Sequence, residues 1–508
     1  MKTRSYAAIF LYVVAVNIPC WIASQSLGFL LKGLFNVEYV VIGILSVFVR
    51  RSLVVVLMLS AIVLDILSSI SWTYMLSASE LLGSARFLFE FAPSHIWDMV
   101  AVAICTIMIC LMAVLATKDR VPDRQRRYVV LTLGVFVILC VIVDAGTGQN
   151  GMFRLDHQLG FIRLTREPVR SLIAVQKYKH LVPDGTNASV VAASTVLVGL
   201  TPTTNSLRMD AKAPNLVLIL LESWGNALDT NMNESLLRPY SNSNIREKYT
   251  MRRGTVPFYG PTIDGEAREL CGSAMGFGIL TASVAQLKSC LPARLDMIGY
   301  HSMGIHGFTA RMFDRNKWYG KIGFDETWFR DQLQQQGLPL CPGPFRGICD
   351  AAVSTWIGDQ LQRNSDSPQF IYWVTLNSHL PVPVPNLVKA PPHCSEIPAT
   401  AQNPTLCSWY QLVFNVHRSV SELALRPTDH PTIFLIVGDH VPPFSSSKLK
   451  SQFSDQVVPY ILLMPKINGI REGSQVARPL AVATHLPAET RRHHFKWAKS
   501  SSHVPGAS

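Results

Sequence analysis

The sequence contains few charged residues for its length. Asp, Glu, Lys and Arg together make up 16% of 508 residues, and apolar residues make up 48%. This balance is unusual for an enzyme that is soluble throughout and typical of one that is partly embedded in a membrane. The sequence also lacks any RNA- or DNA-binding motif, so its net charge of +12 does not indicate a nucleic-acid partner.

Five long apolar runs predict a multi-span α-helical membrane domain over residues 1–146. The runs cover 7–27, 34–49, 53–75, 97–116 and 128–145. A buried helix of a soluble domain explains any one run, but not a series of runs between basic loops. The basic residues beside them are Lys2, Arg4, Arg50, Arg51, Lys118, Arg120, Arg124, Arg126 and Arg127. The positive-inside rule then places the N-terminus in the cytoplasm and everything after the fifth run outside.

Three further segments follow the apolar runs. Residues 147–213 are expected to connect the membrane to the outer domain, and their first part alternates apolar residues with Arg. An amphipathic helix on the outer membrane face and an ordinary surface helix explain that part equally well. Residues 181–213 are rich in Thr, Ser, Ala and Pro and are expected to be a linker. An outer domain over 214–466 and a poorly ordered basic tail over 467–508 complete the organisation.

The outer domain contains three continuous apolar runs that end in polar residues. These are NLVLILLE (215–222), FIYWVTLNSH (370–379) and TIFLIVGDH (432–440). Such runs are typical of strands buried on both faces of a parallel sheet. Helices are expected between them, over 282–299 and 350–364 among others. The predicted fold class is therefore α/β, with a mostly parallel central sheet and helices on both faces.

Polar side chains at the ends of these runs predict a metal site. Glu222 ends the first run, Asn377 to His379 end the second, and Asp439 and His440 end the third. Ligands of such sheets bind at the carboxyl ends of strands, so these side chains are expected to meet there. Two carboxylates and an imidazole, together with a hydroxyl, suit Mn²⁺ or Zn²⁺, with Mg²⁺ as a third option. The alternative is structural: an N-cap or buried ion pair for Glu222, and a turn for the Asp-His pair.

A loop between the strands supplies a hydroxyl. The segment GTVPFYGPTIDGEARELCG (254–272) leads into a helix that is expected to start near Thr262 or Asp264. A hydroxyl at a helix N-terminus lies near positive partial charge, and a metal bound to it would make it a nucleophile toward phosphorus. The alternative is that Thr262 only caps the helix, and the spacing alone favours the cap.

The outer domain has six cysteines and no CxxC pair, which argues against a cysteine metal site. They are Cys271, Cys290, Cys341, Cys349, Cys394 and Cys407. Six cysteines outside the cytoplasm permit three disulfides. The expected local pairs are Cys341–Cys349 and Cys394–Cys407, and the remaining pair is Cys271–Cys290.

Five motifs resemble those of the alkaline-phosphatase/sulfatase superfamily, in the same order. They are PNLVLILLESWG, PTIDGEARELCG, IHGFTARMFDRNKWYGKIGFD, VTLNSHLP and LIVGDH. The branch that they resemble most is that of lipoteichoic acid synthase, which has five membrane spans and an extracellular catalytic domain. The nucleophile loop also resembles that of phosphoglycerol transferases that decorate periplasmic glucans. Phosphoethanolamine transferases that modify lipid A are more distant.

The resemblance implies roles for particular residues. Thr262 matches the family's nucleophile, and Glu222, Thr262, Asp439 and His440 match its metal ligands. The positions that match headgroup-binding residues are His306, Arg315 and His379. Where the branch has a Trp on the sugar side, this chain has Phe313 followed by Asp314.

The resemblance implies a transferase that moves a phospho-headgroup from a phospholipid donor to a cell-surface or periplasmic glycan through a phospho-threonine. Phosphoglycerol is the favoured headgroup and phosphoethanolamine the second. The expected location is the bacterial inner membrane, with the catalytic domain on the outer side. Two alternatives are a hydrolase of the same superfamily, either sulfatase or phosphodiesterase, and an inactive membrane regulator. CLPAR (290–294) fits the motif that sulfatases convert to formylglycine, but it lies a whole helix too late, so we interpret the match as chance.

Overall fold

The structure is a computed structural model, and it describes the outer domain more completely than the N-terminal region. Besides isolated positions before residue 190, the described ranges are 35–45, 48–74, 76–84, 123–146, 190–201, 212–258, 260–342, 345–363, 367–380, 394–444 and 447–466. The first and fourth apolar runs, the expected connector helix and the expected basic tail lie largely or wholly outside these ranges.

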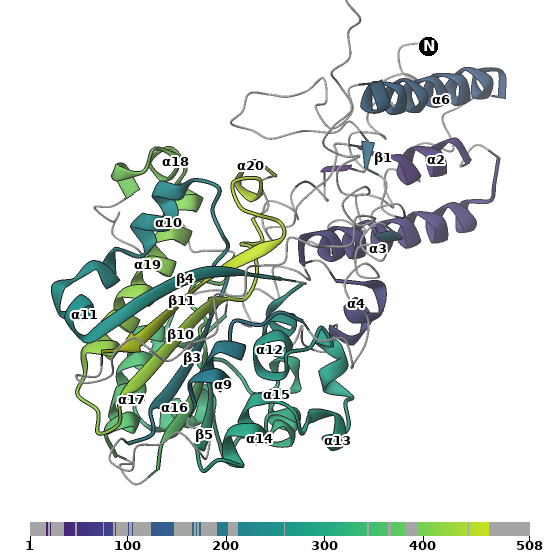
Figure 1. Ribbon diagram of the computed structural model, residues 1–508. Coiled ribbons are helices and arrows are strands. Elements are labelled where there is room, and N and C mark those ends of the chain that lie inside the picture. Colours follow the sequence, from purple (N-terminus) through teal and green to yellow (C-terminus); the bar gives the residue numbers. More distant parts are fainter. Residues whose placement is uncertain are drawn as a thin grey trace, which may run out of the picture.

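A seven-stranded sheet forms the centre of the outer domain (Figure 1). Its spatial order is β4-β11-β10-β3-β9-β5-β6. The strands are β3 (Asn215–Leu221), β4 (Tyr249–Pro257), β5 (His301–His306), β6 (Glu326–Trp328), β9 (Gln369–Val374), β10 (Thr432–Gly438) and β11 (Val457–Pro465). The five neighbours from β10 to β6 run parallel, and β11 is antiparallel to both β10 and β4. This confirms the prediction of a mostly parallel sheet.

Helices lie on both sides of this sheet. The longer ones, α17 (Asp350–Arg363) and α19 (Pro404–Leu425), lie on the opposite side from α12 (Thr262–Cys271) and α14 (Leu291–Asp296) (Figure 1). The shorter helices are α9 (Thr195–Leu200), α10 (Thr230–Leu236), α11 (Ser243–Lys248), α13 (Val284–Leu287), α15 (Arg315–Trp318), α16 (Arg330–Gln335), α18 (Pro398–Ala401) and α20 (Ser447–Lys450). Single 3₁₀ turns are η3 (Arg238–Ser241), η4 (Gly276–Leu280), η5 (Met312–Asp314), η6 (Gly320–Ile322) and η7 (Cys394–Glu396), and a small hairpin joins β7 (Leu340–Cys341) to β8 (Gly347–Ile348).

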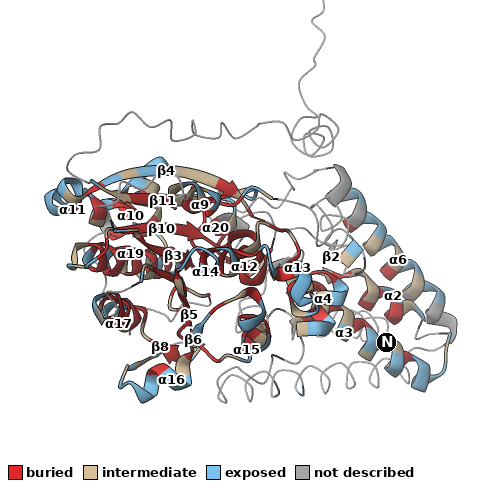
Figure 2. Ribbon diagram, turned by 60° about the horizontal axis from the view of Figure 1, so that its bottom comes forward, coloured by how far each residue is buried: buried red, intermediate tan, exposed pale blue. Residues whose placement is uncertain are grey.

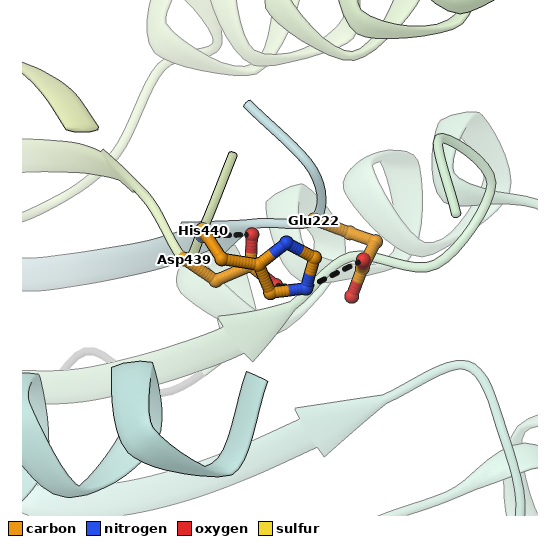
Figure 3. A group of neighbouring side chains, drawn as sticks. All are labelled: Glu222, Asp439 and His440. Carbon is orange, nitrogen blue, oxygen red and sulfur yellow. Dashed lines mark hydrogen bonds and ion pairs between the residues drawn. The ribbon is translucent and has the colours of Figure 1, made fainter. Parts of the chain in front are cut away.

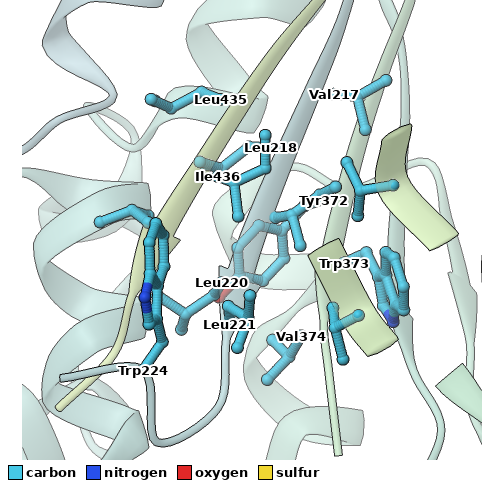
Figure 4. Packing of buried hydrophobic residues seen from close by; sticks show 14 of the residues in the cluster. Val217, Leu218, Leu220, Leu221, Trp224, Tyr372, Trp373, Val374, Leu435 and Ile436 are labelled. Atoms are coloured by element: carbon cyan, nitrogen blue, oxygen red, sulfur yellow. The ribbon is translucent and has the colours of Figure 1, made fainter. Parts of the chain in front are cut away.

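The three apolar runs form the core strands. Every residue of β3, β9 and β10 is buried, and burial extends across the two helical layers (Figure 2). Side chains such as Leu218, Trp373 and Ile436 pack together at the centre (Figure 4). Strands buried on both faces have no polar face, which is why their sequences run apolar without alternation.

One helix prediction is confirmed and another is wrong. The stretch expected at 350–364 is α17. The stretch expected as one helix over 282–299 is divided into α13 and α14. Cys290 between them has extended backbone geometry and bonds to Cys271, and Pro292 lies in the first turn of α14. Because proline has no N–H and its ring excludes a preceding helical turn, it begins a new helix there.

The segment before β3 contributes to the outer domain. Residues 190–201, within the stretch expected to be a linker, contain α9, and Leu197 of α9 is fully buried in the main core. The backbone N–H of Val190 donates to the carbonyl of Gly272 at 3.0 Å. Gly272 adopts a left-handed conformation (φ 59°) that ends α12, a geometry that glycine accepts without steric cost.

The N-terminal region supports a membrane domain only in part. Its described helices are α2 (Val37–Leu45), α3 (Arg51–Tyr74), α4 (Ala78–Ser84) and α6 (Asp123–Gly146), and a two-stranded contact joins β1 (Phe35–Asn36) to β2 (Thr165–Arg166). Among the described residues, one helical stretch, Ser52–Ser71, has the length and apolarity needed to cross a membrane. The expected runs 34–49 and 128–145 correspond to the shorter α2 and to α6. The count of five spans stays a prediction.

Candidate metal and nucleophile site

Two carboxylates meet where β3 and β10 end. The strands are neighbours and parallel, and Gly438 lies opposite Leu221. The next residues, Glu222 and Asp439, therefore leave the sheet at the same edge, and His440 follows directly (Figure 3). Ligand atoms of all three side chains lie within 4.8 Å of one another. The structure thus brings together the three residues that sequence patterning selected.

The charges in this cluster are strongly coupled. Burial raises the pKa of Asp439 well above its usual value, and the nearby Glu222 charge raises it further. Burial also acts to raise the pKa of Glu222, but the charges of His379 and His440 leave it below its usual value. Two buried carboxylates this close cannot both carry a charge without a compensating cation.

The residues fit a divalent cation. Asp439 Oδ2 is buried and makes no hydrogen bond, and it lies 3.3 Å from His440 Nε2. That nitrogen is also 3.4 Å from Glu222 Oε1. His440 Nδ1 lies 2.9 Å from the carbonyl of Val441. A proton held on Nδ1 by this carbonyl leaves the Nε2 lone pair available, as in many metal-binding histidines.

Thr262 lies at the same site. It is the first residue of α12, which confirms the expected helix start, and its Oγ1 donates to Glu222 Oε2 at 3.1 Å. The N-cap of α12 is Pro261, and no side chain caps the helix. The hydroxyl is thus directed at the carboxylate cluster, so the interpretation of Thr262 as a simple cap is wrong.

Helix α12 is anchored to the end of β10 by a buried arginine. Arg268 Nη2 donates to the carbonyl of Gly438 at 2.8 Å and Nη1 to that of Pro257 at 3.0 Å. Its Nε pairs with Glu269 at 2.6 Å, and Glu269 in turn accepts the backbone N–H of Ser194 at 2.8 Å. This chain of contacts connects the segment before β3 to the end of β10, which Asp439 directly follows.

Two histidines border the cluster. His306 ends β5, and its Nδ1 lies 3.0 Å from the carbonyl of Val374. Burial and the charge of Arg315 lower the pKa of His306 to about 3. His379 Nδ1 lies 2.6 Å from the carbonyl of Leu380, and its Nε2 is 4.0 Å from Glu222 Oε1. Burial is the main cause that lowers the pKa of His379 below its usual value.

Arg315 forms a buried ion pair inside the protein. Its Nε and Nη2 contact the carboxylate of Glu266 at 2.9–3.1 Å, and Tyr319 donates to the same carboxylate at 2.6 Å. The ring of Phe313 lies 5.2 Å from the guanidinium, and Phe313 and Asp314 both have positive φ. Glu266 thus holds Arg315 in place, close enough to His306 to affect its pKa. Headgroup binding by Arg315 or Phe313 stays a prediction.

The sequence analysis placed Ser378 at this edge of the sheet but did not select Thr375 or Ser223, which also contact Glu222. Its N–H donates to Thr375, its carbonyl accepts from Ser378, and Ser223 donates to its carboxylate. Asp350 holds the loop that contains His379 by accepting the N–H groups of Leu376 and Asn377. The sequence of α12 could have indicated buried polar contacts near the site. It contains four charged residues within six positions of a helix whose first turn was expected to face the site: Asp264, Glu266, Arg268 and Glu269.

The three expected disulfides are present: Cys271–Cys290, Cys341–Cys349 and Cys394–Cys407. Cys290 is fully buried. Its sulfur is therefore bonded inside the domain, which agrees with the interpretation of CLPAR as a chance match.

A sulfatase family model matches residues 214–479. The chain belongs to the sulfatase family, which confirms its resemblance to the alkaline-phosphatase/sulfatase superfamily. The comparison with curated proteins found no match.

Solved structures with similarity to the chain include three transferases or synthases. The lipoteichoic acid synthase LtaP of Listeria monocytogenes is 15% identical, with a TM-score of 0.37, over 55% of this chain and 72% of that one. The phosphoglycerol transferase GacH of Streptococcus pyogenes is 14% identical, with a TM-score of 0.31, over 56% of this chain and 72% of that one. The lipooligosaccharide phosphoethanolamine transferase A of Neisseria meningitidis is 10% identical, with a TM-score of 0.32, over 53% of this chain and 79% of that one. Likenesses of this level assign no activity to the chain.

Proposed function

We propose that this chain is a membrane-bound transferase that moves a phospho-headgroup from a phospholipid to a cell-surface or periplasmic glycan. Phosphoglycerol is the favoured headgroup, ahead of phosphoethanolamine. The observation that carries the proposal is the direction of the Thr262 hydroxyl, which donates to Glu222 instead of capping α12. A hydroxyl at a helix N-terminus beside a carboxylate–imidazole cluster is suited to nucleophilic attack on phosphorus.

A divalent cation, Mn²⁺ or Zn²⁺ before Mg²⁺, would be held by Glu222, Thr262, Asp439 and His440. When bound, it lowers the pKa of the Thr262 hydroxyl and offsets the negative charge of the phosphodiester. These four side chains provide three oxygen ligands and one nitrogen, the mixture that ions of intermediate hardness prefer.

The first half-reaction moves the headgroup onto the protein. Thr262 Oγ1 forms a bond to phosphorus, and its proton leaves through the hydrogen bond to Glu222. The bond from phosphorus to the diacylglycerol oxygen breaks, and that oxygen takes a proton from His379 Nε2 or His306 Nε2. An anionic phosphodiester beside these rings raises their lowered pKa values, so that one ring holds the required proton.

The second half-reaction regenerates the site. A glycan hydroxyl forms a bond to the phosphorus of phospho-Thr262 while the bond from phosphorus to Thr262 Oγ1 breaks. The glycan proton passes to the histidine that gave up its proton in the first half-reaction, and Oγ1 takes back its own proton from Glu222. Arg315, which pairs with Glu266 and lies close enough to His306 to affect its pKa, would favour the extra negative charge that develops on the phosphoryl oxygens.

Product analysis tests this proposal. Purified full-length chain is incubated with phosphatidylglycerol or phosphatidylethanolamine carrying a labelled headgroup, with Mn²⁺ and a glycan acceptor. We expect label on the glycan and free diacylglycerol. Thr262→Ala is expected to lower the rate by about 10³-fold or more, and Thr262→Ser to retain part of it because the hydroxyl remains.

Release of the headgroup only to water, with the acceptor present, would instead favour the phosphodiesterase alternative. Normal transfer by Thr262→Ala would exclude Thr262 as the nucleophile.

A further inference from the structure

Ser223, directly after the Glu222 ligand, has an unusual backbone conformation. Its φ is +57°, and among the described residues only Phe313 and Asp314 share a positive φ without being glycine. The left-handed region brings Cβ close to the backbone and is disfavoured for serine. Such residues persist where surrounding contacts hold them, and they cluster at functional sites.

Every polar group of Ser223 is engaged. Its Oγ donates to Glu222 Oε1 at 2.8 Å, and its backbone N–H donates to Asp439 Oδ1 at 2.7 Å. Its carbonyl accepts the indole N–H of Trp409 at 2.9 Å. Ser223 is fully buried, so these bonds have no competition from solvent. One residue thus contacts both carboxylates of the candidate metal site, one through its side chain and one through its main chain.

These contacts determine which carboxylate oxygens stay available. Oδ1 of Asp439 accepts the backbone N–H groups of Ser223 at 2.7 Å and of His440 at 2.6 Å, whereas Oδ2 makes no hydrogen bond. On Glu222, the Ser223 hydroxyl donates to Oε1 and the Thr262 hydroxyl donates to Oε2. These two hydrogen bonds together fix the orientation of the carboxylate. Groups that orient metal ligands in this way commonly change metal affinity when they are removed.

We propose that Ser223 is a positioning residue that sets the affinity of the site for a divalent cation through its hydroxyl. This inference rests on the metal site of the proposed function. Its structural rival is that Ser223 only shapes the turn after β3. The rival depends on the backbone conformation and on the bond from Trp409, both of which persist when the hydroxyl is removed.

Two variants separate these roles. Ser223→Gly removes the hydroxyl and also the steric cost of positive φ, whereas Ser223→Ala removes the hydroxyl and keeps that cost. The matched control is Ser354→Ala, because Ser354 is also buried and its Oγ donates one hydrogen bond, at 3.0 Å to the carbonyl of Ser419.

The experiment measures Mn²⁺ binding by calorimetry on the full-length, chelator-treated chain, together with the melting temperature of the metal-free form. We expect both Ser223 variants to bind Mn²⁺ roughly 10- to 100-fold more weakly than wild type. The metal-free Gly variant should melt above the Ala variant. Ser354→Ala should bind Mn²⁺ as tightly as wild type.

The outcomes divide the two claims. Wild-type affinity in Ser223→Gly overturns the role of the hydroxyl while the metal site stands. If Ser354→Ala weakens Mn²⁺ binding as much as the Ser223 variants do, the role of the Ser223 hydroxyl is overturned as well. The lost affinity would then be a general effect of removing a buried hydroxyl. A wild-type chain that binds no Mn²⁺ and is not stabilised by Zn²⁺ or Mg²⁺ removes the metal site and this inference with it.

Discussion

Three histidines of the site have the same arrangement around their rings. In His306, His379 and His440, Nδ1 lies 2.6–3.0 Å from a backbone carbonyl. A proton held on Nδ1 leaves the Nε2 lone pair available. The proposed function uses this atom as a metal ligand in His440 and as a carrier of a proton in the other two. The proposed roles differ because His440 lies 3.3–3.4 Å from both carboxylates, whereas His379 lies 4.0 Å from Glu222.

A buried histidine away from the site predicts acid sensitivity. Burial lowers the pKa of His417 to about 3, and its Nδ1 lies 3.1 Å from the hydroxyl of Tyr240. The folded state keeps this ring neutral, whereas the unfolded chain protonates it below its ordinary pKa near 6.5. Stability from His417 is therefore present above pH 6.5 and is lost as the pH falls toward 3, by about 1.4 kcal/mol per pH unit.

Urea unfolding of wild type and His417→Gln between pH 7 and pH 4 measures this contribution. We expect the variant to have the flatter pH dependence. Equal slopes in the two proteins would show that His417 does not set the acid sensitivity.

At the level of elements, the site depends on how closely α12 approaches the end of β10. A Cβ added at Gly265 would lie 3.2 Å from Asp439 Cα, so glycine permits this approach. Arg268 then bonds α12 to the carbonyl of Gly438. The position of Thr262, the proposed nucleophile, relative to Asp439 follows from these two residues together.

We predict that Arg268→Ala destabilises the outer domain by about 3–5 kcal/mol, because it leaves the buried Glu269 carboxylate without its cation. The control is Arg330→Ala, which breaks an exposed pair with Asp331 and should cost at most about 1 kcal/mol. Chemical denaturation measures both. Similar small losses in the two variants would contradict a structural role for Arg268.

The strands with continuous apolar runs could be predicted from sequence, and so could the cluster of candidate ligands at their ends. Parallel neighbours deliver their next residues to one edge, so Glu222 and Asp439 were expected to meet there. The contacts of Ser223 and Arg268 could not be predicted, because they depend on a left-handed turn and on packing between α12 and β10. Pro292 indicated the break between α13 and α14, because proline favours the first turn of a new helix. The prediction of one helix over 282–299 did not take this proline into account.

For the whole molecule, the arrangement of the chain across the membrane is a separate prediction. The basic loops predict a cytoplasmic N-terminus and an external residue 220. Reporter fusions after residue 220 measure the side directly, and we expect external activity only. Cytoplasmic activity would contradict both the topology and the access of the site to surface glycans.

The central claim is that Thr262 carries the headgroup as a covalent intermediate. The most direct test is peptide mass spectrometry of the full-length chain after brief incubation with phosphatidylglycerol or phosphatidylethanolamine in the absence of acceptor. We predict that the peptide containing Thr262 gains the mass of one phospho-headgroup and that Thr262→Ala gains none. An unmodified Thr262 peptide while diacylglycerol is being released, or the same added mass on another residue, would contradict the account.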